Sequence, residues 1–317
     1  MDGILIIDKP AGITSHDVVA RARRILKTKR IGHTGTLDPF ATGVMIILVE
    51  RATRLAQFLD KDAKEYEATV RLGFETDTGD RDGELRITNY ELRDVSNGEI
   101  EDVLKVFRGE IEQTPPMYSA KKVAGKKLYE LARKGIEIER KSVKVKISEI
   151  EATSELRITN YEEEASALQS EISSDFGLWT LDFGLKVSCS AGTYIRTLAE
   201  DIGRKLETGA HLAELRRTRA GKFGIDRAVT LEKLEEIVAT DKLFEVLIST
   251  NEAVSHLPEI KLSAEDAGRI KNGIKLNVDL PEINGQEFVR LTSEKNLIAI
   301  GVYNRGEKTV QPKVVLV

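Results

Sequence analysis

Residues 32–43, Gly-His-Thr-Gly-Thr-Leu-Asp-Pro-Phe-Ala-Thr-Gly, carry the side chain best suited to chemistry, the carboxylate of Asp38. Three glycines, three threonines and one proline in this stretch disfavour both helix and strand, so we expect an ordered loop with special backbone angles. Pro39 restricts Asp38 toward extended backbone. An isolated Asp-Pro pair usually only initiates a turn, but a carboxylate fixed in such a loop can act as a nucleophile or a general base.

Two flanking segments can hold this loop rigidly. Ser15 can cap a helix that runs to about Lys27, and the apolar residues 44–49 predict a strand directly after the loop. Loops mounted on rigid elements are the usual carriers of catalytic groups. The sequence therefore predicts a functional loop between a helix and a strand.

The remaining periodic segments indicate a mixed architecture. Strand patterns occupy residues 3–7, 66–72, 143–150 and 178–188, and helical spacing occupies residues 128–133, 194–206 and 231–238. Strands and helices do not alternate regularly, which argues against a doubly wound parallel sheet. We expect an α+β fold with a largely antiparallel central sheet.

Composition limits the classes of function. The 317 residues suit one large and one smaller domain. Cys189 is the only cysteine and the four histidines are scattered, which disfavours a disulfide or a zinc site. The apolar stretch near the N-terminus is too short for a signal peptide or a membrane span. We expect a cytoplasmic protein with no metal and no membrane partner.

The charge distribution favours a nucleic-acid partner, although the net charge of −4 does not. Basic residues are concentrated in three runs, at residues 21–30, 117–146 and 216–222. A single run is usually a solvated face. Three runs beside the chemical motifs favour a surface that contacts phosphates.

Acidic residues are concentrated near residues 84–99 and 154–176. Each stretch includes the octapeptide Glu-Leu-Arg-Ile-Thr-Asn-Tyr-Glu, at 84–91 and again at 155–162. The copies are too short and too far apart for a solenoid. We interpret both stretches as insertions in surface connections, where added length costs little loop entropy. Their role is not evident from the sequence.

The last part of the chain has a different character. Residues 249–258 resemble a linker, and short apolar runs separated by glycines follow at residues 288–291, 297–302 and 310–317. We expect a domain of residues 1–248, followed by a small β-rich domain of residues 249–317.

Several motifs, in order along most of the chain, resemble the TruB family of bacterial tRNA pseudouridine synthases. The blocks are Asp8-Lys9-Pro10-Ala11-Gly12, the loop 32–43, Lys64-Glu65-Tyr66, residues 71–80, Pro115-Pro116-Met117-Tyr118-Ser119-Ala120-Lys121-Lys122, Gly192-Thr193-Tyr194-Ile195-Arg196, Gly209-Ala210-His211-Leu212 and Leu215-Arg216-Arg217. The resemblance implies a pseudouridine synthase fold and a C-terminal PUA-like RNA-binding domain. It also implies isomerisation of the uridine at position 55 in the tRNA T loop, without a cofactor.

The resemblance also implies catalytic residues. Asp38 falls on the catalytic carboxylate of the family, and Arg196 on the partner that pairs with it. Tyr66 falls on the tyrosine that stacks on the flipped base and is placed to help remove its C5 proton. Whether Asp38 attacks C1′, attacks C6 or removes a ribose proton stays open.

Other residues are implied in binding the T stem-loop of tRNA. Leu215 packs on the base, His33 fills space left by flipped nucleotides, and Arg54 contacts phosphate. Lys9 shapes the wall of the site, and Tyr194 lies in the block of Arg196. The resemblance implies a monomer without an obligatory protein partner.

Three alternatives stay open on the sequence alone. A guide-RNA-dependent synthase fits the same motifs, although the chain length speaks against it. A non-catalytic module that binds or folds tRNA would not need Asp38, Tyr66 and Arg196 together. A glycoside hydrolase would need a second acid, for which Asp77 and Asp80 are candidates.

Overall fold

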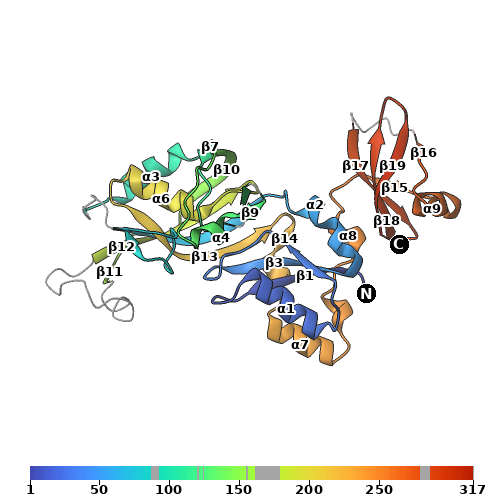
Figure 1. Ribbon diagram of the computed structural model, residues 1–317, viewed down its shortest axis with the longest axis horizontal. Coiled ribbons are helices and arrows are strands. Elements are labelled where there is room, and N and C mark those ends of the chain that lie inside the picture. Colours follow the sequence, from blue (N-terminus) through green and yellow to red (C-terminus); the bar gives the residue numbers. More distant parts are fainter. Residues whose placement is uncertain are drawn as a thin grey trace.

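The computed structural model describes residues 1–86, 93–119, 121–123, 125–154, 156–160, 179–278 and 286–316. Over these ranges the chain forms a ten-stranded central sheet and a five-stranded sheet near the C-terminus, with helices on their faces (Figure 1). In the described ranges, no helix has both the length and the apolar character needed to cross a membrane.

The central sheet is mixed and largely antiparallel, as predicted. Its strand order is β1 (Gly3–Lys9), β3 (Thr42–Val49), β13 (Ala210–Ala220), β4 (Lys64–Leu72), β12 (Trp179–Cys189), β10 (Val143–Ala152) and β7 (Gly109–Gln113). Three short strands extend it: β2 (Ile31–Thr34) beside β3, β11 (Arg157–Asn160) beside β12, and β14 (Phe223–Gly224) beside β13. The pairing of β13 with β3 is parallel and places Arg217 opposite Gly43, at the end of the Asp38 loop.

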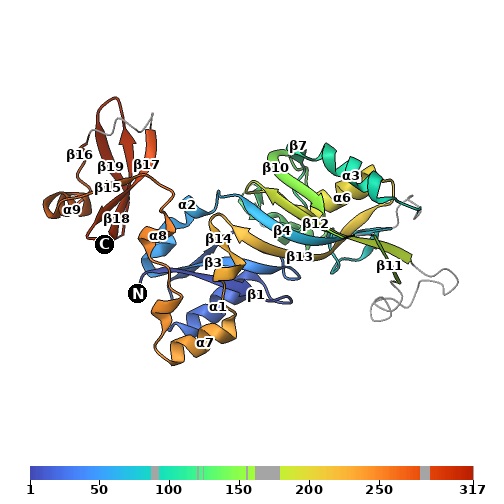
Figure 2. The same ribbon diagram turned by 180° about the vertical axis from the view of Figure 1, so that it is seen from behind.

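Strands β1 and β3 are covered on both faces, which explains the continuous apolar run of β3. One face packs on α1 (Ser15–Ile25) and α7 (Leu231–Ala239), through residues such as Leu5 and Ile47. The other face packs on α2 (Ala56–Leu59) and α8 (Thr250–Ala253) through Ile4 and Ile46. Figures 1 and 2 show α1 and α7 together below these strands. The Asp38 loop therefore extends from a rigid layer.

The other half of the central sheet is covered by α3 (Asn97–Val106) and α6 (Ile195–Lys205). Val70, Leu185 and Ile202 are fully or almost fully buried in this second core. Of these elements, the sequence patterns predicted α6, β4 and β12, but not α3, β7 or β13.

The start of α1 differs by one residue from our expectation. Thr14, not Ser15, is the N-cap, because its side chain accepts a hydrogen bond from the backbone N–H of Asp17, and the Asp17 carboxylate accepts one from the Thr14 N–H. Ser15 is the first helical residue, and its hydroxyl contacts the backbone of Leu37. The residue expected to cap the helix thus supports the Asp38 loop.

The five-stranded sheet has the order β15 (Glu259–Lys261), β17 (Gln286–Ser293), β18 (Asn296–Asn304), β19 (Thr309–Val315) and β16 (Leu276–Asn277), with α9 (Ala264–Lys271) against it. This confirms a β-rich C-terminal part, which lies at one end of the molecule in Figure 1. The expected linker contains α8, whose residues contact β1 and β18. Ile300 joins Ile4 and Phe58 in one apolar cluster.

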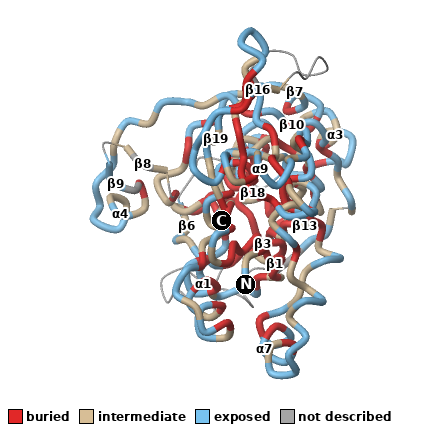
Figure 3. The backbone as a smooth tube through the Cα atoms, turned by 90° about the vertical axis from the view of Figure 1, so that its right-hand side faces the viewer, coloured by how far each residue is buried: buried red, intermediate tan, exposed pale blue. Residues whose placement is uncertain are grey.

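The remaining elements are short and lie in connections. They are η1 (Glu50–Leu55), η2 (Ile225–Arg227), η3 (Leu243–Glu245), the pair β5 (Glu75–Thr76) and β6 (Leu85–Arg86), and the pair β8 (Lys122–Val123) and β9 (Lys126–Lys127) followed by α4 (Leu128–Ala132). In Figure 3, β8, β9 and α4 stand off from the buried centre. Much of the two expected acidic insertions lies outside the described residues, at 87–92, 155 and 161–178.

Candidate active site

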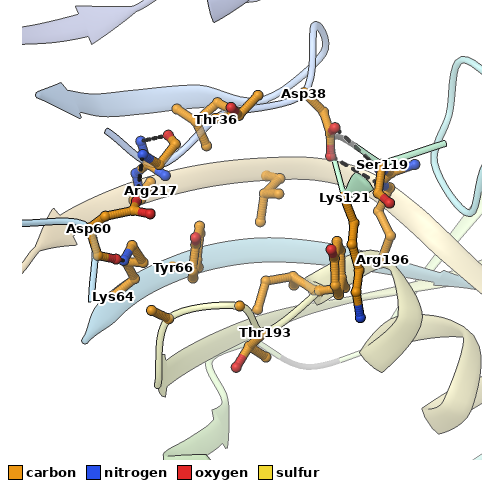
Figure 4. Close-up of a pocket in the computed structure, with 17 residues that line it drawn as sticks. Thr36, Asp38, Asp60, Lys64, Tyr66, Ser119, Lys121, Thr193, Arg196 and Arg217 are labelled. Carbon is orange, nitrogen blue, oxygen red and sulfur yellow. Dashed lines mark hydrogen bonds and ion pairs between the residues drawn. The ribbon is translucent and has the colours of Figure 1, made fainter. Parts of the chain in front are cut away.

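A cavity of about 260 Å³ lies beside the Asp38 loop. Its walls are residues 35–38 of the loop, Tyr66 on β4, Leu215 and Arg217 on β13, and residues 191–196 at the start of α6. In Figure 4, Asp38 and Arg196 occupy one end, Asp60, Lys64 and Arg217 the other, and Tyr66 lies between them.

The Asp38 loop is fixed by buried side chains from the N-terminal motif. The fully buried Lys9 ammonium donates hydrogen bonds to the carbonyl oxygens of Pro10 (2.9 Å), Pro39 (3.0 Å) and Ala41 (2.6 Å). Burial lowers the pKa of Lys9 to about 8, although the Asp38 charge opposes this. The Ser15 hydroxyl accepts from the Leu37 N–H at 2.9 Å and donates to the Leu37 carbonyl at 3.0 Å.

The Asp38 carboxylate forms a two-pronged ion pair with Arg196. Arg196 Nε lies 2.9 Å from one carboxylate oxygen, and Nη2 donates to the other at 3.2 Å. The Arg196 side chain is 5% exposed, whereas that of Asp38 is 34% exposed. Because a guanidinium fork matches a carboxylate, the pair fixes Asp38 while leaving it open to the cavity.

A second carboxylate holds the same guanidinium from behind. Arg196 Nη1 lies 3.4 Å from Asp80 Oδ2 and donates to the Thr78 carbonyl at 2.7 Å. Its Nη2 also donates to the Tyr118 carbonyl at 2.7 Å. Burial raises the pKa of Asp80, and the positive charge of Arg196 opposes that rise. Sequence reasoning considered Asp80 only as a possible second acid.

Tyr66 and Tyr194 bring two phenol rings to the cavity. Burial raises the pKa of both hydroxyls, with Arg217 partly opposing the rise at Tyr66 and Ser119 that at Tyr194. Both tyrosines are therefore neutral near neutral pH. Leu215 lines the same cavity from β13 and is 7% exposed. This combination suits a flat ring held between an aromatic and an aliphatic side chain.

Three residues singled out from the sequence do not line this cavity: Lys9, which supports the loop, and His33 and Arg54. His33 lines a neighbouring cavity of about 290 Å³, and burial lowers the pKa of its imidazole. Its ring lies edge-on to His16, with the ring centres 5.7 Å apart. Arg54 is exposed on η1 and donates to the Val315 carbonyl at 2.6 Å, where the two large sheets meet.

Sequence reasoning did not single out several residues that line the cavity, namely Asp60, Ser119, Lys121 and Arg217. Ser119, Lys121 and Arg217 fall in blocks of the TruB resemblance, so a signal existed for them. Asp60 follows α2 outside every block. Only the fold brings its carboxylate to the loop.

Two solved structures share this fold over 99% of the chain. One is a chain of an H/ACA RNP bound to a substrate RNA containing 2′-deoxyuridine, at 27% identity, with a TM-score of 0.71 and 85% of that chain covered. The other is a chain of a Cbf5-Nop10-Gar1 complex, at 28% identity, with the same TM-score and the same coverage of that chain. The chain therefore shares its fold with a component of an RNA-bound complex.

The chain belongs to the TruB family of pseudouridylate synthases. The family model for the N-terminal domain matches residues 23–195, and the tRNA pseudouridylate synthase B C-terminal domain matches residues 196–255. The tRNA pseudouridine synthase B of Geobacillus thermodenitrificans is 42% identical over 304 residues, which cover 95% of each chain. That of Geobacillus kaustophilus is 43% identical, over 93% of this chain and 98% of its own. The expected pseudouridine synthase fold is confirmed.

Proposed function

We propose that this chain is a tRNA pseudouridine synthase that isomerises the uridine at position 55 of the T loop. The observation that carries the proposal is the partly exposed carboxylate of Asp38. It is paired with Arg196 at one end of a cavity that Tyr66 also lines. The names of the relatives support the substrate class.

The reaction breaks the bond between N1 of uracil and C1′ of ribose, turns the base, and forms a bond between C5 and C1′. The C5 proton leaves and N1 regains a proton, so no redox partner is needed. Asp38 supplies the carboxylate that acts on the nucleotide, as a nucleophile or as a base. Arg196 compensates its charge, because the guanidinium forms a two-pronged ion pair with the carboxylate.

Binding requires the target base to leave its stack, which costs a few kcal/mol. Tyr66 offers a ring on which the flipped uracil can stack, and Leu215 packs against it. The neutral Tyr66 hydroxyl is positioned to take part in the transfer of the C5 proton. Tyr194 completes the aromatic wall.

We assign supporting roles to three further residues. Lys9 donates to two carbonyls of the Asp38 loop, those of Pro39 and Ala41, so it holds the loop in shape. His33, beside the catalytic cavity, occupies the space that neighbouring flipped nucleotides leave. Arg54 contacts phosphate close to β19 of the C-terminal sheet, where it also donates to the Val315 carbonyl.

We assign residues 1–248 to a catalytic domain and residues 249–317 to a PUA-like RNA-binding domain. The C-terminal sheet has a hydrophobic core of its own, which includes Ile270, Val289 and Tyr303. We place the enzyme in the cytoplasm, as a monomer that needs no protein partner. Sedimentation of the active purified chain at a monomer mass would support this assignment, and a requirement for a second protein would overturn it.

The test uses unmodified tRNA that carries tritium at C5 of uridine, without guide RNA. The wild-type chain should release tritium from the T-loop uridine, and Asp38→Asn should lose release while keeping its fold and its affinity for tRNA. A guide-RNA-dependent synthase is the second candidate, because a chain of an H/ACA RNP is among the similar structures. Release that appears only with a guide RNA would favour it. Binding of tRNA without release by the wild type would favour a non-catalytic module.

A further inference from the structure

The backbone at Gly35 is held by charged side chains on both of its polar groups. The Asp60 carboxylate accepts a hydrogen bond from the Gly35 N–H at 3.0 Å. Arg217 Nη2 donates to the Gly35 carbonyl at 2.8 Å, while its Nε donates to the Val44 carbonyl at 2.7 Å. The two side chains come from distant parts of the chain, the end of α2 and strand β13.

Each partner is itself fixed. Arg217 is 1% exposed and is one of the largest fully buried side chains among the described residues. Lys64 Nζ donates to the carbonyls of Asp60 and Asp62, at 2.7 and 2.8 Å, and so holds the segment that carries Asp60. Burying a cation is costly unless hydrogen bonds compensate it. Two hydrogen bonds of Arg217 go to backbone carbonyls on either side of Asp38, those of Gly35 and Val44.

Glycine suits the held position. Gly35 has φ of +63°, and a Cβ added there would lie 3.2 Å from Arg217 Nη1. The close approach of the guanidinium and the left-handed backbone thus depend on each other. Asp38 follows only three residues later, so a shift of the Gly35 peptide is carried directly to the catalytic carboxylate.

We propose that Asp60 and Arg217 are positioning residues. They form hydrogen bonds to the two sides of Gly35, to its N–H and its carbonyl, and thereby fix Asp38 relative to Tyr66 for turnover. The proposal rests on the proposed function. Lys9 holds the loop after Asp38, and the hydrogen bonds of Asp60 and Arg217 to Gly35 hold it before Asp38. A displacement of about 1 Å in a catalytic group can cost on the order of a hundredfold in rate, so both anchors matter for kcat.

The central test compares Asp60→Ala with Asp60→Asn. Asp60 is exposed, so neither change disturbs a core. Alanine removes the acceptor for the Gly35 N–H, whereas asparagine keeps an acceptor oxygen. We expect kcat to fall about tenfold or more in Asp60→Ala, with tRNA affinity within about twofold of wild type, and Asp60→Asn to recover most of kcat.

A buried-arginine control separates positioning from stability. Arg217→Lys keeps a donor and should lose less kcat than Arg217→Met. Arg71→Met removes another buried arginine, which pairs with Asp182 on the same sheet at 2.8 Å but lies outside the cavity wall. It should lower the melting temperature and leave kcat unchanged well below that temperature. Equal kcat losses in Arg71→Met and Arg217→Met would overturn the proposal.

Hydrogen exchange gives a readout that does not depend on activity. Peptides covering residues 32–41 should exchange faster in Asp60→Ala than in wild type, and near the wild-type rate in Asp60→Asn. If Asp60→Ala had the exchange rate and the kcat of the wild type, the positioning role of Asp60 would be refuted. If the wild-type chain released no tritium but residues 32–41 exchanged faster in Asp60→Ala, the proposed function would be wrong. The role of Asp60 in holding Gly35 would still stand.

Discussion

In the active site, Arg196 serves two carboxylates with different exposure. Asp38 is 34% exposed and faces the cavity, while the Asp80 side chain is 7% exposed and lies behind the guanidinium. The Thr78 hydroxyl donates to Asp80 at 2.7 Å and the Asp82 N–H at 3.1 Å, so Asp80 is held independently of Arg196. Asp80 therefore anchors Arg196, and Arg196 anchors Asp38.

We expect Asp80→Asn to lower kcat by roughly tenfold or more while tRNA affinity stays close to wild type, because the amide no longer attracts the guanidinium. Single-turnover tritium release measures this effect. Asp77→Asn is a matched control on the same loop, since among the described residues the Asp77 side chain accepts a hydrogen bond from the Glu84 N–H, which asparagine can also do. Comparable loss in the control would mean that loop folding, and not the anchoring of Arg196, limits the rate.

Motif blocks predicted part of this site. The structure brings Asp38, Tyr66 and Arg196 to one cavity, as the resemblance implied. The support around them was less predictable. Asp60 reaches Gly35 across 25 residues and belongs to no block, because a hydrogen bond to backbone places few demands on local sequence. Residues that belong to a distinctive motif are therefore easier to predict from the sequence than residues that support them through backbone contacts.

At the scale of elements, α6 carries two charged groups: Arg196, which pairs with Asp38, and Glu200, which pairs with Arg204. One turn after Arg196, Glu200 lies 3.5 Å from Arg204, which also pairs with Glu75 at 3.0 Å and Asp201 at 3.2 Å. Three carboxylates thus share one guanidinium. Burial raises the pKa of Glu200 to about 7, because the charged form is poorly solvated there.

This shift predicts how stability changes with pH. Between about pH 4.5, the ordinary value for glutamate, and pH 7, the unfolded chain loses the Glu200 proton while the folded chain keeps it. The contribution of Glu200 to the free energy of unfolding therefore falls as pH rises through this window. Glutamine resembles the protonated form, so Glu200→Gln should match wild type at pH 4 and be more stable at pH 8.

Urea unfolding from pH 4 to pH 8 measures the difference. Glu236→Gln, on the exposed face of α7, is the control and should show no comparable dependence on pH. A constant difference between Glu200→Gln and wild type across this range would contradict the buried, raised pKa.

The elements themselves were predicted unevenly, for a physical reason. β1, β3 and β4 have apolar or alternating patterns that match their burial, so their strands were expected. β13 includes Glu214, Arg216 and Arg217, and its charges mask a strand that lies between β3 and β4. Those charged residues are tolerated because tertiary contacts satisfy them. Arg216 pairs with Asp8 at 2.7 Å, and Arg217 holds two carbonyls.

At the scale of the whole molecule, the two large sheets share a core. Leu297, Ile300 and Leu316 from the C-terminal sheet region belong to the same buried cluster as Ile4 and Phe58. The rings of Phe58 and Phe288 also meet edge to face, with centres 5.1 Å apart. Patterns in the sequence predicted an α+β part and a small β-rich C-terminal part. They did not predict this shared cluster, because an apolar residue does not specify which other apolar residues it will pack against.

A shared core predicts that the two sheets unfold together. Ile300→Ala removes a fully buried side chain from the shared cluster and should cost roughly 2–5 kcal/mol of unfolding free energy. Trp179, the only tryptophan of the sequence, belongs to β12 in the central sheet, which was not changed. We expect the urea midpoint followed by tryptophan fluorescence to fall together with the midpoint from circular dichroism. Ile274→Ala, at a position 45% exposed, should move neither midpoint. If Ile300→Ala left the Trp179 midpoint in place while circular dichroism resolved a second transition, the sheets would be independent units and the shared cluster would not couple them.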